Sequence, residues 1–144
     1  MSAARVSIEA QQQELIEEFS AFDDWMQKYE YIIELGKELP VIEEAYRNED
    51  HLIKGCQSRV WLHAALDDEG NLKFTADSDA IITRGMVAMV IRVLDGQKPL
   101  DVANANLHFV NDIGLSTHLS PTRSNGLAAM IKQMKMYGLA LSVS

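Results

Sequence analysis

Cys56 is the only cysteine in the sequence of 144 residues, and it lies in a polar stretch that runs from Lys54 to Arg59. Gly55 gives the backbone the freedom to present a side chain at a loop tip. Lys54 and Arg59 supply positive charge, which favours the thiolate, the reactive form of cysteine. The stretch therefore predicts a reactive thiol. The alternative is a small, buried and inert side chain.

Histidines could bind a metal together with this thiol, or could act as the base that activates it as a nucleophile. The four in the sequence, which have no ligand-like spacing to one another, are His51, His63, His108 and His118. Structural zinc sites and iron-sulfur clusters usually take several cysteines, so the sequence predicts no metal site. His63, on the strand predicted after Cys56, is a candidate base for a cysteine hydrolase. A partly exposed strand residue is the simpler interpretation.

Arg123 follows Ser120 and Pro121, which mark the start of a predicted helix. A cation near a helix start is disfavoured by the helix dipole unless an anion lies close by. A thiolate or persulfide would be such an anion, and so would an ordinary carboxylate. The sequence leaves a functional and a structural role open for Arg123, whereas Asp77 and Asp79 are most simply read as a helix cap.

The amino-terminal segments that must support these residues read as two helices. From Ile8 onward, apolar residues recur every three or four positions, with Gln and Glu between them. Asp23 and Asp24 predict the cap of a second helix, and Gly36 and Pro40 mark its end. The polar segment 43–50 that follows is expected to be irregular.

The middle of the chain has the two-residue period of strands. Apolar residues alternate over 60–66 and again over 72–76, and the acidic turn 67–71 lies between them. This pattern predicts an antiparallel hairpin. Residues 51–54 are expected to add a short third strand.

Helices follow the hairpin. Ser78 or Asp79 is expected to cap a central, most buried helix over 81–94, which Gly96 and Pro99 end. A short helical region is predicted over 102–113. The last predicted helix buries a stripe formed by Leu127, Met130, Ile131, Met134 and Tyr137. The order of elements indicates an α+β fold, with a small antiparallel three-stranded sheet packed with helices, in a single domain over 1–144.

The charge and hydropathy of the chain exclude some partners. The formal net charge of -8 argues against nucleic acid, because phosphate binding requires clustered Lys and Arg. No apolar run approaches the ~20 residues that span a bilayer, and residues 1–13 lack the apolar core of a signal peptide. We therefore expect a cytoplasmic protein that binds neither nucleic acid nor membrane.

Several separated motifs in this sequence resemble the SufE family of sulfur acceptors. The motifs, in chain order, are residues 29–40 (YEYIIELGKELP), 55–61 (GCQSRVW), 77–79 (DSD) and 119–127 (LSPTRSNGL). The resemblance covers nearly the whole chain except the first several residues. It implies a fold shared with iron-sulfur scaffold proteins of the IscU type, although the scaffold function, which needs several cysteines, does not carry over.

The resemblance implies that Cys56 takes persulfide sulfur from a cysteine desulfurase of the SufS or CsdA type by transpersulfuration. Such a protein stimulates the desulfurase and delivers sulfur to an iron-sulfur scaffold or another acceptor. It would be an accessory sulfurtransferase without independent turnover. It needs no cofactor of its own, because the pyridoxal phosphate belongs to the desulfurase. A binding or regulatory module in which Cys56 is incidental is the first alternative, and a free-standing thiol enzyme is the second.

The resemblance also suggests roles around the catalytic Cys56. Arg123 would lie near the Cys56 loop, and Asp79 would belong to the surface engaged in docking. Gly55, Gln57 and Ser58 would support the loop. The loop is further expected to shelter the sulfur against apolar residues until a partner draws it out.

Overall fold

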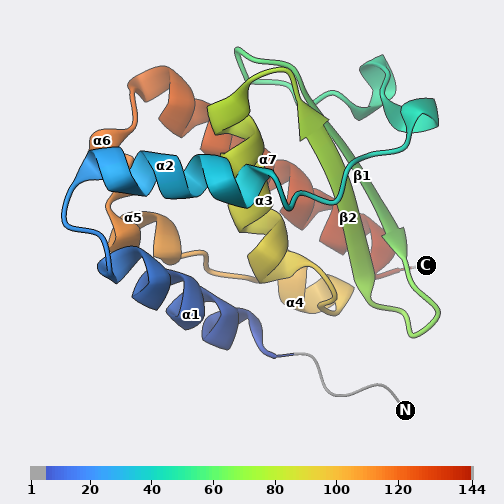
Figure 1. Ribbon diagram of the computed structural model, residues 1–144. Helices are drawn as coiled ribbons and strands as arrows, with labels where there is room; N and C mark the ends of the chain where they lie inside the picture. Colours follow the sequence, from blue (N-terminus) through green and yellow to red (C-terminus); the bar gives the residue numbers. More distant parts are fainter. Residues whose placement is uncertain (1–5, 144) are drawn as a thin grey trace.

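The computed structural model describes residues 6–143 and has an α+β fold, as the element order predicts. Seven α-helices and two antiparallel strands lie in this part of the chain (Figure 1). Their bounds are α1 Ile8–Ser20, α2 Trp25–Gly36, β1 Val60–Leu66, β2 Leu72–Ser78, α3 Ile81–Leu94, α4 Pro99–Ala103, α5 Phe109–Ile113, α6 Leu115–His118 and α7 Pro121–Leu141. Residues 1–5 and 144 lie outside the described residues. The prediction of a single domain over 1–144 includes all of them, and the prediction that no signal peptide is present includes residues 1–5.

The sheet has two strands within the described residues, so the prediction of a third strand over 51–54 is wrong. β1 and β2 pair from Val60 with Ser78 to Leu66 with Leu72. Leu52 forms a single isolated bridge with Trp61. A short 3-10 turn, Glu49–His51, precedes Leu52, and a turn at residues 54–55 follows it. Too few extended residues remain between the two turns for a ladder.

α3 is the central helix, and its burial agrees with the sequence prediction. It lies against α2 on one side and against β2 and α7 on the others (Figure 1). Most of its residues from Gly85 to Leu94 are buried. α2 approaches it so closely that a β-carbon on Gly85 would lie 2.1 Å from the carbonyl oxygen of Ile32. Glycine is required there because no side chain fits between the two backbones.

The start of α3 differs from the prediction that Ser78 or Asp79 caps it. Ala80 holds the N-cap position, and no side chain caps the helix there. Ser78 is instead the last residue of β2, and its hydroxyl donates to the carbonyl oxygen of Arg59 at 2.7 Å. β2 therefore extends two residues further than the alternating pattern indicates, and Ser78 joins the strand to the loop before β1.

α7 is the long last helix, and it runs behind α3 and the sheet in Figure 1. Its start is as predicted: Pro121 is the first residue, and the Ser120 hydroxyl accepts from the backbone N–H of Arg123 at 3.3 Å. In the predicted stripe, Leu127, Met130 and Met134 are buried, while Ile131 and Tyr137 are half-buried. The predicted helical region 102–113 is split between α4, which begins at Pro99, and α5.

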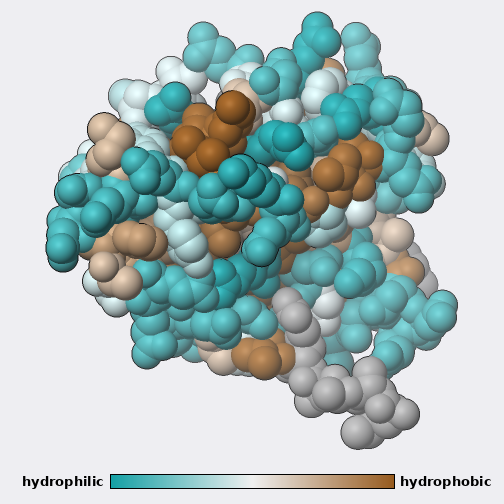
Figure 2. All heavy atoms as spheres, in the orientation of Figure 1, coloured by the Kyte–Doolittle hydropathy of each residue, from teal (hydrophilic) through white to brown (hydrophobic). Residues whose placement is uncertain are grey.

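The surface seen in Figure 2 is mostly hydrophilic, with hydrophobic side chains in separate patches. Exposed apolar residues include Met26, Val41 and Ile81. Within residues 6–143, no helix combines the length and the hydropathy that crossing a membrane requires.

Candidate functional site

The loop that carries Cys56 connects Leu52 to β1 and is fixed to the sheet at both ends. At its start, the backbone N–H of Ile53 donates to the carbonyl oxygen of Val60 at 2.8 Å. At its end, the backbone N–H of Arg59 donates to the Asp79 carboxylate at 3.1 Å, and the Arg59 carbonyl accepts from Ser78. Hydrogen bonds therefore hold both ends of the loop.

Gly55 allows the loop to turn immediately before the cysteine. Its φ is +93°, in the region that favours glycine, and a β-carbon there would lie 3.3 Å from the β-carbon of Ala129 on α7. Another residue at position 55 would therefore be strained and would crowd α7. The glycine brings the following residue, Cys56, against the first turns of that helix.

The Cys56 thiol is half-buried rather than exposed at a loop tip. Its Sγ donates a hydrogen bond to the carbonyl oxygen of Gly126 at 3.5 Å, and the side chain packs against the hydrophobic core. Burial raises the pKa of the Cys56 thiol. This direction is opposite to the one that the neighbouring cations favour, because Lys54 and Arg59 are exposed to solvent while the sulfur is withdrawn from it.

A cavity of about 490 Å³ lies beside the sulfur and brings most of the predicted site residues together. The loop contributes Cys56, Gln57 and Ser58, and α7 contributes Arg123. The remaining lining residues are Ala80, Ile82, Thr83 and Met86 from the start of α3, and Ser120, Thr122, Gly126 and Met130 from α7 and its cap. Polar groups and apolar side chains thus face one another across the same small space.

Arg123 is exposed and is one of the residues that line this cavity. Within residues 6–143 its guanidinium has no hydrogen-bond or ion-pair partner; only its backbone N–H is bonded, to Ser120. Among the described residues, no carboxylate lines the cavity. An anion formed at the sulfur would therefore share this space with an uncompensated positive charge.

Asp79 does not line the cavity. Its carboxylate accepts from the backbone of Arg59 and so holds the end of the Cys56 loop. Its neighbour Asp77 is buried and forms ion pairs with Arg47 and Arg84. The cap interpretation of these two acids is wrong, because both are occupied in tying β2 to other segments.

The histidines lie apart from the sulfur, and none lines its cavity. His63 Nδ1 is 3.4 Å from His51 Nε2, and its ring stacks on Tyr46. Burial, with the neighbouring His51, lowers the pKa of His63. In the described part of the chain, no group of three or more His, Cys, Asp or Glu side chains is arranged to hold a metal ion.

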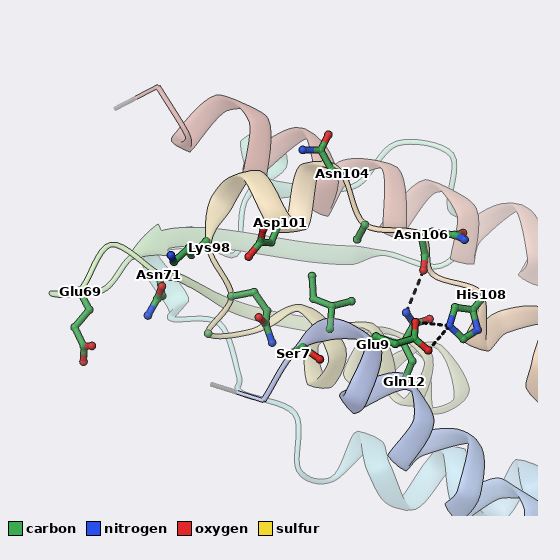
Figure 3. Close-up of a pocket in the computed structure, with 14 residues that line it drawn as sticks. Ser7, Glu9, Gln12, Glu69, Asn71, Lys98, Asp101, Asn104, Asn106 and His108 are labelled. Atoms are coloured by element: carbon green, nitrogen blue, oxygen red, sulfur yellow. Dashed lines mark hydrogen bonds and ion pairs between the residues drawn. The ribbon is translucent and has the colours of Figure 1, made fainter. Parts of the chain in front are cut away.

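A second cavity, of about 760 Å³, lies between α1, α4 and the hairpin turn (Figure 3). Some of the polar groups that line it are bonded to one another. Gln12 donates to the carbonyl oxygen of Asn106 at 3.0 Å, and His108 contacts the Glu9 carboxylate at 2.7 Å. These contacts tie α1 to the segment before α5. No cysteine is among the described residues that line it.

Sequence reasoning missed the residues that α3 and α7 add to the sulfur cavity, above all Gly126 and Met130. The one available signal is that Gly126 lies inside a predicted helix, three residues after Arg123. Glycine in a helical pattern costs stability relative to alanine. Which residue it would face could not be read from the sequence, because Cys56 lies 70 positions earlier.

Comparisons with known proteins agree with this fold. A family model described as "SufE: Fe-S metabolism associated domain" matches residues 13–138, which include every residue of the sulfur cavity. The solution structure of a hypothetical protein from Thermus thermophilus is similar in fold, with a TM-score of 0.77. It is 18% identical in sequence, and the match covers 93% of this chain and 97% of that one.

Proposed function

The chain belongs to the SufE family and so to a family associated with Fe-S metabolism, and on that premise we propose that Cys56 accepts sulfur from a cysteine desulfurase. Cys56 then carries this sulfur, as a persulfide, to a scaffold or another acceptor in iron-sulfur cluster assembly. The pyridoxal phosphate of the first reaction belongs to the desulfurase. The protein is an accessory sulfurtransferase that stimulates its partner and has no turnover alone.

The observation that carries the proposal is the position of the thiol in a cavity whose free charge is Arg123. In the transfer step, the Cys56 thiolate attacks the outer sulfur of the desulfurase's cysteine persulfide. A new S–S bond forms at Cys56, the donor's S–S bond breaks, and the donor cysteine leaves as a thiolate. Sulfur is transferred with no external oxidant or reductant.

The raised pKa of Cys56 fits a carrier that rests in a protected state. The protonated thiol donates to the Gly126 carbonyl, an acceptor that stabilises the neutral form and repels the thiolate. Deprotonation therefore has to accompany movement of the sulfur away from Gly126. The Arg123 guanidinium, on the same cavity, is the group placed to stabilise the resulting anion.

Docking is proposed for the surface around the Cys56 loop, where Gln57, Arg59 and Asp79 are exposed. Asp79 belongs to this surface and also holds the loop end through Arg59. A partner that displaces this hydrogen bond would release the loop. Docking and exposure of the sulfur are then one event, which restricts transfer to the cognate partner.

Incubation with a cysteine desulfurase and free cysteine, followed by mass spectrometry of the intact protein, tests the proposal. We expect an addition of about 32 Da, removed by reductant, which needs no peptide mapping because Cys56 is the only thiol. Cys56→Ser should still bind the desulfurase but lose all stimulation. A variant that stimulates as well as the native protein would identify a binding module in which Cys56 is incidental.

A further inference from the structure

Gly126 lies in the second turn of α7, and its missing side chain faces the Cys56 sulfur. A β-carbon built there would lie 3.7 Å from Sγ. Apart from the chain neighbours of Gly126 and the backbone of its own helix, the sulfur is the one atom within 4 Å of that position in the part of the chain described. The glycine therefore leaves an empty volume about the size of a methyl group beside the thiol.

The thiol form of the protein does not need this empty volume. A separation of 3.7 Å between a β-carbon and a sulfur is ordinary van der Waals contact, so alanine would fit beside Cys56 as it stands. The backbone of Gly126 is helical with no positive φ, so its conformation does not require glycine either. Glycine in a helix interior lowers stability relative to alanine, and nothing in the thiol form explains why glycine stands at position 126.

We infer that Gly126 is a positioning residue that keeps room for the outer sulfur of the Cys56 persulfide. This inference rests on the proposed function. An S–S bond is about 2.05 Å long, so an added sulfur reaches well into the space between Sγ and a methyl group 3.7 Å away. Alanine at position 126 would close many of the directions that the outer sulfur can take.

The walls around this volume suit a persulfide. Met86 and Met130 are fully buried, and with half-buried Ile82 they give the cavity a soft and apolar side. The outer sulfur of a persulfide is polarisable, and methionine side chains are soft enough to fit irregular space around it. An outer sulfur held among these side chains is removed from water and from small nucleophiles. The free space beside Gly126 is thus needed by the persulfide form of Cys56 and not by its thiol form.

The test compares the native protein, Gly126→Ala and the control Asn125→Ala. Asn125 is exposed on the same helical turn and does not line the cavity. Each reduced protein is loaded with glutathione persulfide, freed of excess reagent and exposed to cyanide, which removes the outer sulfur as thiocyanate. No desulfurase is present, so docking does not affect the result. Alkylation of the unloaded thiol by iodoacetamide is measured in parallel.

We expect Gly126→Ala to release thiocyanate roughly tenfold faster than the native protein and Asn125→Ala, because overpacking by one methyl group expels the outer sulfur. The rate of thiol alkylation should change by less than about twofold, since the thiol already fits. Equal thiocyanate rates, or thiol and persulfide rates that rise by the same factor, would overturn the inference. So would failure of the variant to fold, because the resting thiol would then need the glycine.

Failure of the proposed function gives a different result. A native protein that takes up sulfur neither from glutathione persulfide nor from a desulfurase is not a sulfur carrier, and the role of Gly126 falls with it. A native protein that takes up sulfur and protects it no better than Gly126→Ala remains a carrier, and the inference about Gly126 alone is wrong.

Discussion

The carbonyl oxygen of Ile32 in α2 lies directly against Gly85 in α3, 2.1 Å from the place of a β-carbon. The same β-carbon would meet the Ile32 side chain at 2.5 Å. Both contacts are too short for real atoms, so the helices must separate to admit even one methyl group. Because α3 is the centre of the core, the separation would disturb most of the fold.

Gly85→Ala is accordingly predicted to lower the free energy of unfolding by about 3 kcal/mol. Urea denaturation followed by circular dichroism measures this loss. Gly126→Ala is the matched control, an identical substitution in a helix where the β-carbon meets only Sγ at 3.7 Å. It should leave the midpoint unchanged or raise it. A Gly85→Ala protein as stable as this control would show that α2 and α3 are not in close contact.

The burial of Cys56 predicts slow modification of the folded protein. A raised pKa means that less thiolate is present at neutral pH, and thiolate is the form that iodoacetamide alkylates. We expect alkylation of the native protein at pH 7.5 to be at least about tenfold slower than in 6 M guanidinium chloride, and to accelerate above pH 9. Native protein that reacts as fast as the unfolded chain would contradict a sheltered thiol.

Releasing the end of the Cys56 loop should make alkylation of Cys56 faster. Asp79→Ala removes the acceptor of the Arg59 backbone N–H. The Ser78 hydroxyl and the backbone N–H of residue 79, which both donate to the Arg59 carbonyl oxygen, remain to hold the loop end. The loop should open more often, so alkylation of Cys56 should accelerate by about threefold to tenfold. Asp68→Ala, in the exposed hairpin turn, is the control and should have no effect. An unchanged rate in Asp79→Ala would show that this hydrogen bond does not keep the loop closed.

His108 predicts a small dependence of stability on pH. Hydrogen bonds to Asp112 and then Glu9 raise the pKa of His108 above its ordinary value, so the folded protein holds this proton more tightly than the unfolded chain. The contribution is fully present below about pH 6.5 and is lost as the pH rises through the raised pKa. Because the group lies at the surface, it should be under about 1 kcal/mol.

Denaturant unfolding of the native protein and His108→Gln between pH 5.5 and 9 measures this contribution. The native protein should be the more stable at pH 5.5, and the difference should shrink toward pH 9. His118→Gln is the control, since that ring makes no ion pair in residues 6–143. A difference that grows with pH would mean that neutral His108 is the stabilising form.

The helices of this protein could be predicted from its sequence because their signals are local. The apolar period of α1 and α3, the Asp24 cap of α2, and Ser120 with Pro121 before α7 act within a few residues. The third strand over 51–54 was predicted wrongly because both ends of that segment belong to turns. Leu52 has the extended backbone of a strand, but turns on both sides of it leave one bridge.

The loop that carries the thiol could also be located from the sequence, whereas its electrostatics could not. Lys54 and Arg59 are the nearest charges along the chain, yet both are exposed. The pKa of Cys56 is governed by burial against groups that include Gly126, on a helix that begins 65 residues later, at Pro121. Position along the chain predicts the neighbours of a loop poorly, because tertiary packing decides them.

The hydrogen bond from Cys56 to Gly126 joins residues 70 positions apart. During synthesis, the thiol therefore emerges before the helix that covers it. The ribosome releases the cysteine loop long before α7, and non-local contacts form only when both segments are available. Until α7 docks, the thiol is open to oxidants and stray electrophiles. A nascent chain, or a fragment that stops before Pro121, therefore carries a cysteine that no fold protects.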